Sequence, residues 1–277
     1  MNDADLCRSI TSNPDLAIKH CTAAIEGRKA SNEMLAQWYV LRGVQWADKG
    51  DYERAIADHT AALKLDPTVR HANYYRGSAW SHKGEFDHAI ADFDAAAKLS
   101  ADDPVVYHAR GVELTVKGDY LRAIADFEKA LQLDAKAGGV HFARGRTLFY
   151  MSEFARASGD FEAAFKAQPN VYTALWLFLA RKRSGNHDAD DLLERETRGI
   201  RAGWPAPLIA LYMGRTGEFV WVLRRLYDFQ PSDAATAIRA LLAAANVEMN
   251  RPAVEAGLSM LDAGGDFADG VIAYEGN

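Results

Sequence analysis

Apolar residues recur every three or four positions through most of the chain, which is the spacing of an amphipathic helix and not of a strand. Residues 39–67, YVLRGVQWADKGDYERAIADHTAALKLDP, show this pattern twice, with Gly50-Asp51 between the halves. Glycine is favoured at a helix C-terminus, and the helix dipole favours an acidic residue at the start of the next helix. The pattern therefore predicts two consecutive helices that end at Pro67, because proline cannot continue a helix without losing a hydrogen bond.

The helical hairpin pattern recurs at a constant interval along the chain. Four residue types keep this interval through four successive segments, which indicates a repeat architecture. They are Gly43, Gly77, Gly111 and Gly145; Ala55, Ala89, Ala123 and Ala157; Arg42, Arg76, Arg110 and Arg144; and Asp58, Asp92, Asp126 and Asp160.

The recurring small and aromatic residues predict how the helices pack. A glycine inside a helix costs about 1 kcal/mol relative to alanine, so its recurrence indicates close approach of the backbone of a neighbouring helix. Phe93, Phe127 and Phe161 are expected to fill the space between helices, and His59 takes the same place in the first segment.

The recurring arginines and aspartates predict a ladder of ion pairs, formed either within one segment or between successive segments. A second interpretation is a row of arginines along a ligand groove. Identical recurrence favours the structural ladder, because binding surfaces usually vary between repeats.

These residues resemble the tetratricopeptide-repeat (TPR) family, whose pattern places Leu-Gly, Gly-x-Tyr, Ala, Phe, Ala and Pro at fixed positions in each repeat. The resemblance defines unit one (36–69), unit two (70–103), unit three (104–137) and unit four (138–171). Two departures are the arginine before the first glycine and Ser152 in place of the turn glycine of unit four. The resemblance implies an all-α fold, a right-handed TPR α-solenoid of antiparallel helix pairs.

Residues 1–35 are expected to form an N-terminal capping hairpin. DLAIKHCTAAIEG resembles the second helix of a unit, and residues 3–11 would be its partner. Cys7 and Cys21 then lie on opposing helices, either as two buried thiols or as a disulfide that would require an oxidising compartment. The sequence leaves both alternatives open.

The repeat register weakens after residue 171. Residues 172–230 are expected to form a degenerate TPR-like helical extension, and residues 231–277 further helices and a loose tail. LWLFLA (175–180), Trp204 with Pro205, and LIALYMG (208–214) resemble the segment after the repeats in NlpI-type TPR lipoproteins of the bacterial envelope. This second resemblance covers roughly residues 170–226.

Charge and motifs narrow the function. The net charge of −6 argues against nucleic acid as a partner, and no apolar run is long enough to span a bilayer. No phosphate-binding, nucleophile-elbow or zinc-protease motif occurs, so we expect no enzyme activity, no cofactor and no metal. Without an N-terminal leader the chain is expected in the cytoplasm, or in the periplasm if a leader has been removed.

The TPR resemblance implies a concave groove, lined by the first helix of each unit, that binds a protein or peptide. The groove positions expected here are Val40, Val44, His71, Tyr74, Ser78, His108, Val112, Phe142, Arg146 and Phe149. Tyr74, Phe142, Phe149 and Arg146 are the expected anchors, because aromatic and arginine residues dominate binding hot spots; several could equally pack against a neighbouring helix. The expected function is a non-enzymatic adaptor or scaffold. The resemblance to NlpI-type lipoproteins implies more specifically a scaffold of the bacterial envelope that forms a homodimer. The alternative is a self-assembling structural protein.

Overall fold

The computed structural model describes residues 3–9, 13–27, 30–69, 71–186, 188–189 and 192–193. The chain divides into two compact parts, Met1–Gln168 and Pro169–Asn277, and each is described by itself. Every regular element in the described residues is an α-helix, so the predicted all-α stack of antiparallel helix pairs is confirmed.

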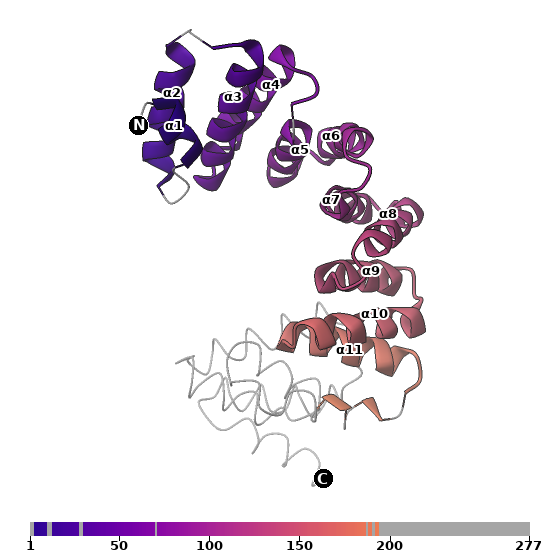
Figure 1. Ribbon diagram of the computed structural model, residues 1–277. Helices are drawn as coiled ribbons and strands as arrows, with labels where there is room; N and C mark the ends of the chain where they lie inside the picture. Colours follow the sequence, from indigo (N-terminus) through magenta and orange to yellow (C-terminus); the bar gives the residue numbers. More distant parts are fainter. Residues whose placement is uncertain are drawn as a thin grey trace, which may run out of the picture. The chain divides into compact units, whose positions relative to one another are not determined.

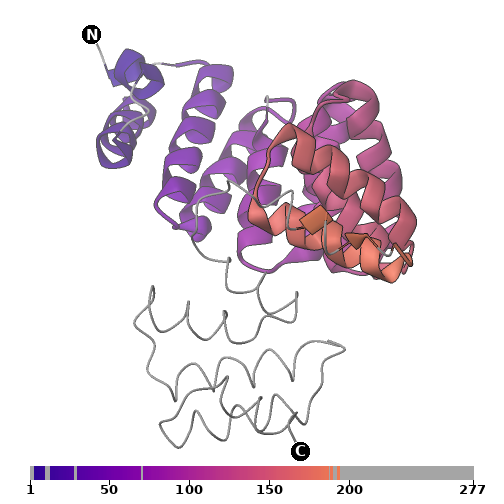
Figure 2. The same ribbon diagram turned by 90° about the horizontal axis from the view of Figure 1, so that it is seen from below.

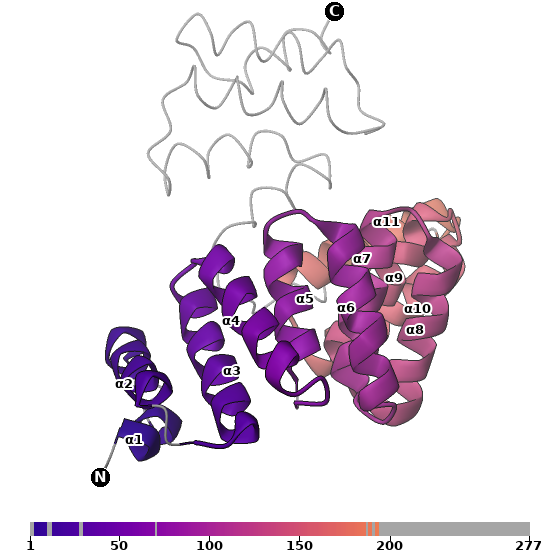
Figure 3. The ribbon, with the colours of Figure 1, turned by 90° about the horizontal axis from the view of Figure 1, so that it is seen from above.

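The N-terminal part consists of a short hairpin followed by four helix pairs (Figure 1). The helices are α1 (Asp3–Ser9), α2 (Pro14–Glu26), α3 (Asn32–Asp48), α4 (Tyr52–Leu65), α5 (Ala72–His82), α6 (Phe86–Leu99), α7 (Pro104–Val116), α8 (Tyr120–Leu133), α9 (Gly138–Tyr150) and α10 (Phe154–Ala167). Each helix packs against the next one along the chain, and the first helices of neighbouring units also contact one another: α3 with α5, α5 with α7, and α7 with α9. Figure 3 shows α3 to α6 side by side in chain order.

Turn chemistry sets the ends of these helices. Gly50, Gly84 and Gly118 lie between the two helices of their units at φ values of 78°, 77° and 80°, a left-handed conformation that glycine adopts without steric cost. Ser152 takes the same place in unit four at φ 63°. In units one and three the acid after the glycine caps the second helix, because the Asp51 carboxylate accepts a hydrogen bond from the Arg54 N–H and Asp119 accepts one from Arg122.

The recurring glycines make room for a ring from the second helix. A methyl group added to Gly111 would lie 2.7 Å from Phe127 Cε1, and one added to Gly43 would lie 2.7 Å from His59 Cε1. Methyl groups added to Gly77 and Gly145 would lie 3.0 Å from Phe93 Cε1 and 2.9 Å from Phe161 Cε1. The sequence predicted close approach of a neighbouring backbone at these glycines. In three units the nearest atoms belong instead to side chains, above all to the ring. Gly77 is the exception among the four, because it also lies close to the backbone oxygen of Ala89.

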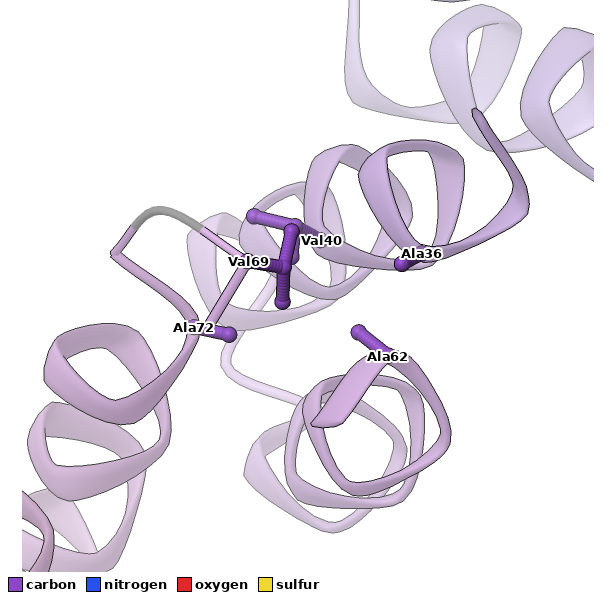
Figure 4. Close-up of a cluster of buried hydrophobic side chains, with 5 residues drawn as sticks. All are labelled: Ala36, Val40, Ala62, Val69 and Ala72. Atoms are coloured by element: carbon purple, nitrogen blue, oxygen red, sulfur yellow. The ribbon is translucent and has the colours of Figure 1, made fainter. Parts of the chain in front are cut away.

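Small apolar side chains join one unit to the next. Ala36 and Val40 of α3, Ala62 of α4, Val69 of the following loop and Ala72 of α5 form one buried cluster. Figure 4 shows Val40 and Val69 meeting between these helices. The cluster crosses the boundary between units one and two, so these two units share a buried core.

The N-terminal hairpin of α1 and α2 lies at one end of the stack, beside α3 (Figure 2). A disulfide joins Cys7 of α1 to Cys21 of α2, which is the second of the two alternatives that the sequence left open. Both cysteines are buried and pack with Trp38 of α3. The hairpin therefore covers the first helix of unit one.

The described residues of the C-terminal part form one complete helix, α11 (Val171–Arg183), which begins where the Asn170 side chain accepts a hydrogen bond from the Thr173 N–H. Most of the expected extension, including Trp204-Pro205 and LIALYMG, and the helices and tail of residues 231–277 lie outside the described residues. In the described part of the chain, no helix has the length and apolar character needed to cross a membrane.

Candidate binding surface on the first helices

The repeated arginines are engaged within the stack. In each unit the guanidinium donates two hydrogen bonds to the aspartate of the second helix, for example from Arg110 Nε to Asp126 Oδ2 at 2.7 Å and from Nη2 to Oδ1 at 2.6 Å. The hydrogen bond from Arg42 to Asp58 is the main reason why the pKa of Arg42 is raised. The ion pairs thus form within each unit, and the predicted structural ladder is confirmed.

The same arginines also reach back to the preceding unit. Arg76 donates to the Thr60 hydroxyl at 3.2 Å, and Arg110 donates to the Asp94 carboxylate at 2.6 Å. The hydrogen bond to Asp160 is the main reason why the pKa of Arg144 is raised, and the charge of Glu128 in the preceding unit adds a smaller effect. The ladder therefore links the units as well as bracing each one.

Three expected groove residues share one position and one packing mode. Tyr74, His108 and Phe142 lie 5.7, 6.1 and 5.7 Å from the ring of the large phenylalanine of their own units, centroid to centroid. All three are half-buried. Burial raises the pKa of Tyr74 and lowers that of His108. Val40, at the same position in unit one, is only 8% exposed and belongs to the core cluster, so we leave it out of the surface proposed below.

The remaining expected positions lie along the same helices. Val44, Ser78 and Val112 are half-buried, as is His71, the residue before α5, which has φ 64°. In unit four the exposed Arg146 donates a hydrogen bond to the Tyr150 hydroxyl at 3.2 Å, and Phe149 meets Phe154 edge to face. These positions therefore form a surface of small, aliphatic and aromatic groups with few charges.

Polar contacts connect the first helices beneath this surface. The Ser81 hydroxyl of α5 donates to Glu113 of α7 at 2.6 Å, and the hydroxyls of Thr115 and Thr147 lie 2.8 Å apart between α7 and α9. These pairs fix the spacing between successive first helices.

A cavity of about 400 Å³ opens where units two and three meet. Two expected groove residues, His71 and Tyr74, line it. The other lining residues were not singled out in the sequence: Thr68, Val69, Asn73, Ala96, Leu99, Ser100, Asp102 and Val106. The signal that could have found this cavity is Asn73, which breaks the aromatic pattern of its repeat position.

The described residues contain no group of three or more histidines, cysteines or acids placed to hold a metal ion. The cavity combines four apolar lining residues with a larger number of polar ones, and convergent polar groups in a concave site are a feature of binding sites.

Comparison with known families identifies the repeats. One tetratricopeptide-repeat profile matches residues 47–104, and a second matches residues 105–136. Residues 47–136 therefore match tetratricopeptide repeats. The matched TPR residues run from the end of α3 through α8, and they include the whole cavity lining. No curated protein matches this chain in sequence.

Several solved TPR structures share the fold. YrrB, a TPR protein with an unusual peptide-binding site, is 21% identical with a TM-score of 0.59, over 72% of this chain and 100% of YrrB. MamA from Desulfovibrio magneticus is 22% identical with a TM-score of 0.54, over 61% of this chain and 96% of MamA. A TPR protein from Parabacteroides merdae is 14% identical with a TM-score of 0.62, over 94% of this chain and 95% of the Parabacteroides chain. At these identities the likeness establishes the fold alone.

Proposed function

We propose that this protein is a non-enzymatic TPR scaffold that binds a protein or peptide segment along its first helices. The observation that carries the proposal is the 400 Å³ cavity lined by His71 and Tyr74, two residues of the expected surface. A concave, partly apolar site with a few polar groups suits a side chain of a bound segment. The peptide-binding site described for YrrB supports the same use of the fold.

The surface favours a partner that is not strongly acidic. Of the ten expected positions only Arg146 carries a fixed positive charge, and the arginines of the ladder are held by aspartates of the stack. Capture of an acidic tail would require several free cationic groups. A helix or an extended apolar segment with a few polar contacts fits this surface better.

The N-terminal disulfide supports an oxidising compartment. Disulfides persist outside the cytosol and are rare within it, so the Cys7–Cys21 bridge fits an exported protein. An NlpI-like scaffold of the bacterial envelope, working as a homodimer, is the more specific form of the proposal. It depends on the sequence resemblance of residues 170–226, which stays a prediction.

A second candidate function is self-assembly into a homo-oligomer. Its support is a pair of exposed apolar side chains at the turn between α7 and α8: Val116 is 56% and Leu121 is 76% exposed. Sedimentation velocity over a hundredfold concentration range tests this candidate. A monomer at all concentrations would exclude it.

Selection from a phage-displayed random dodecapeptide library tests the scaffold proposal. We expect a family of related peptides, whose affinity for the double variant Tyr74→Ala, Phe142→Ala falls at least tenfold. Leu133→Ala is the matched control, because it also removes an exposed apolar side chain but lies on the second helix of its unit. Equal binding by the double variant and the control would overturn the proposal.

A further inference from the structure

The cavity has a specific origin in the repeat. The fourth position of the unit is Tyr39 in unit one, Tyr107 in unit three and His141 in unit four. In unit two the same position is Asn73. Unit two thus lacks the ring that the other units carry.

The tyrosines show what that ring does where it is present. Tyr107 packs against the buried cluster that contains Ala130 and Val140, and its hydroxyl donates a hydrogen bond to the Ala101 carbonyl at 3.1 Å. The guanidinium of Arg110 lies 5.6 Å from the centre of the Tyr107 ring. The ring therefore helps to fill the space between its own second helix and the first helix of the next unit, and it also packs against the cluster that contains Ala96 and Val106.

Unit one repeats this arrangement. Tyr39 packs against the cluster that contains Ala62 and Ala72, the counterparts of Ala130 and Val140. Arg42 lies 5.4 Å from the centre of the Tyr39 ring, as Arg110 does from that of Tyr107. Two units thus pack a phenol ring at equivalent places.

In unit two the counterparts of these wall residues are Ala96 and Val106, and both line the cavity together with Asn73. The cavity lies where the repeat register places a tyrosine ring. Its volume of about 400 Å³ lies within the range of about 300–1,000 Å³ typical of ligand pockets.

The lining suits a ring with a polar edge. Val69 and Leu99 extend the apolar walls, and the Ser100 and Tyr74 hydroxyls supply hydrogen-bonding groups. Asn73 is 8% exposed and lines the cavity. A side-chain amide both donates and accepts hydrogen bonds, so Asn73 favours a ligand hydroxyl over a purely apolar group.

We propose that this cavity binds an aromatic side chain, preferentially the phenol of tyrosine, from the segment that the scaffold captures. The captured ring takes the place that Tyr39 and Tyr107 fill in the neighbouring units. The inference rests on the proposed function, since it names the side chain that the same surface selects.

Titration of the ¹⁵N-labelled full-length protein with N-acetyl-tyrosinamide tests the inference directly. We expect saturable amide shifts in α5, α6 and α7. N-acetyl-phenylalaninamide should bind a few-fold more weakly, and N-acetyl-leucinamide, which lacks a ring, at least tenfold more weakly. Equal affinity for the tyrosine and leucine compounds would overturn the inference.

Two variants make the test specific to the cavity. Asn73→Tyr installs the residue of units one and three, and we expect it to abolish the tyrosinamide shifts while the melting temperature stays the same or rises. Adding Tyr107→Asn to it should restore binding and move the shifts to α7, α8 and α9. Unchanged binding by Asn73→Tyr would contradict the proposal, and circular dichroism confirms that each variant is folded.

The outcomes separate this inference from the scaffold proposal. Library peptides that bind without enrichment of aromatic residues would exclude the aromatic pocket and leave the scaffold proposal standing. Failure to select any peptide would count against the scaffold function, whereas the tyrosinamide titration would still report on the cavity.

Discussion

His59 is the residue at which unit one departs from the packing of the other units. It occupies the place of Phe93, Phe127 and Phe161, is fully buried, and neither of its ring nitrogens has a hydrogen-bond partner among the described residues. Burial, with a smaller effect of Arg76, lowers the pKa of His59 to about 4. The neutral imidazole is therefore the form that fits the core.

The lowered pKa predicts a pH-dependent stability. The unfolded chain binds a proton at His59 with a pKa near 6.5, whereas the folded chain does so only near 4. The contribution of the neutral His59 to the free energy of unfolding is fully present above pH 6.5 and is lost as the pH falls toward 4. Between pH 7 and pH 4 we expect the free energy of unfolding, measured with urea, to fall by about 3 kcal/mol more in the wild type than in His59→Phe. Parallel curves for the two proteins would contradict this prediction.

The glycine packing gives a second prediction at this scale. Gly111→Ala forces a methyl group into the Phe127 ring at 2.7 Å, so we expect a loss of about 1–2 kcal/mol. Gly159→Ala is the matched control: Gly159 also lies inside a helix, but nothing lies within 4 Å of the added methyl group. Because alanine is the better helix former, the control should gain about 0.5–1 kcal/mol. Urea unfolding of both variants measures the difference, and equal effects would rule out the packing argument.

Residues that recur were predictable from the sequence, and the residue that breaks the pattern was not. The constant repeat interval marks Gly43 and Phe127 as packing residues. It does not mark Asn73, because a repeat is recognised by identity between units and the cavity results from a difference. The cavity also depends on Ala96 and Val106, whose small size matters only once the missing ring is known.

At the scale of elements, α1 is the helix that depends most on its neighbours. It has seven residues, and isolated helices shorter than about 12–15 residues are marginal in water. The disulfide to α2 and the packing on Trp38 hold it in place. The N-terminal cap should therefore be sensitive to reduction.

We expect reduction of Cys7–Cys21 to lower the free energy of unfolding by about 3 kcal/mol, the value of the chain-entropy argument for a loop of this size. Thermal unfolding with and without dithiothreitol measures this effect. The variant Cys7→Ser, Cys21→Ser is the control, because its melting temperature should be reduced and should not respond to the reductant. An unchanged melting temperature of the wild type in dithiothreitol, with both thiols shown to be reduced, would contradict the prediction.

The helix hairpins followed from local chemistry, with one exception that the sequence had already marked. Gly50, Gly84 and Gly118 end the first helices as predicted, and Ser152 adopts the left-handed conformation that glycine would take more easily. The choice between a disulfide and two thiols could not be made from the sequence, because it depends on the distance between two helices and not on their spacing along the chain.

At the scale of the whole stack, the arginine ladder sets how the units support one another. Asp126 is buried and binds Arg110 within unit three, whereas Asp94 reaches the same arginine from unit two and is more exposed. The sequence predicted a ladder of the repeated arginines and aspartates, but it left open whether each pair forms within one unit or between successive units. The repeated pairs form within each unit. The contact with the preceding unit uses a different acceptor, such as Asp94, because one guanidinium offers enough donors for two acceptors.

The two acceptors should differ in their effect on stability. Asp126→Ala leaves a half-buried guanidinium without its main partner, and we expect a loss of about 3 kcal/mol in the free energy of unfolding. Asp94→Ala removes a partly exposed pair and should cost at most about 1 kcal/mol. Urea unfolding of the two variants gives the comparison, and a larger effect of Asp94→Ala would show that the contact between units is the stronger one.

The second acceptor changes along the chain, from the Thr60 hydroxyl at Arg76 to the Asp94 carboxylate at Arg110 and the field of Glu128 at Arg144. Each arginine is thus matched to the unit that precedes it. The units are alike in backbone but not interchangeable in order. A chain with units two and three exchanged would set Arg110 beside a threonine and Arg76 beside a glutamate. The contacts between neighbouring units therefore depend on the order of the units.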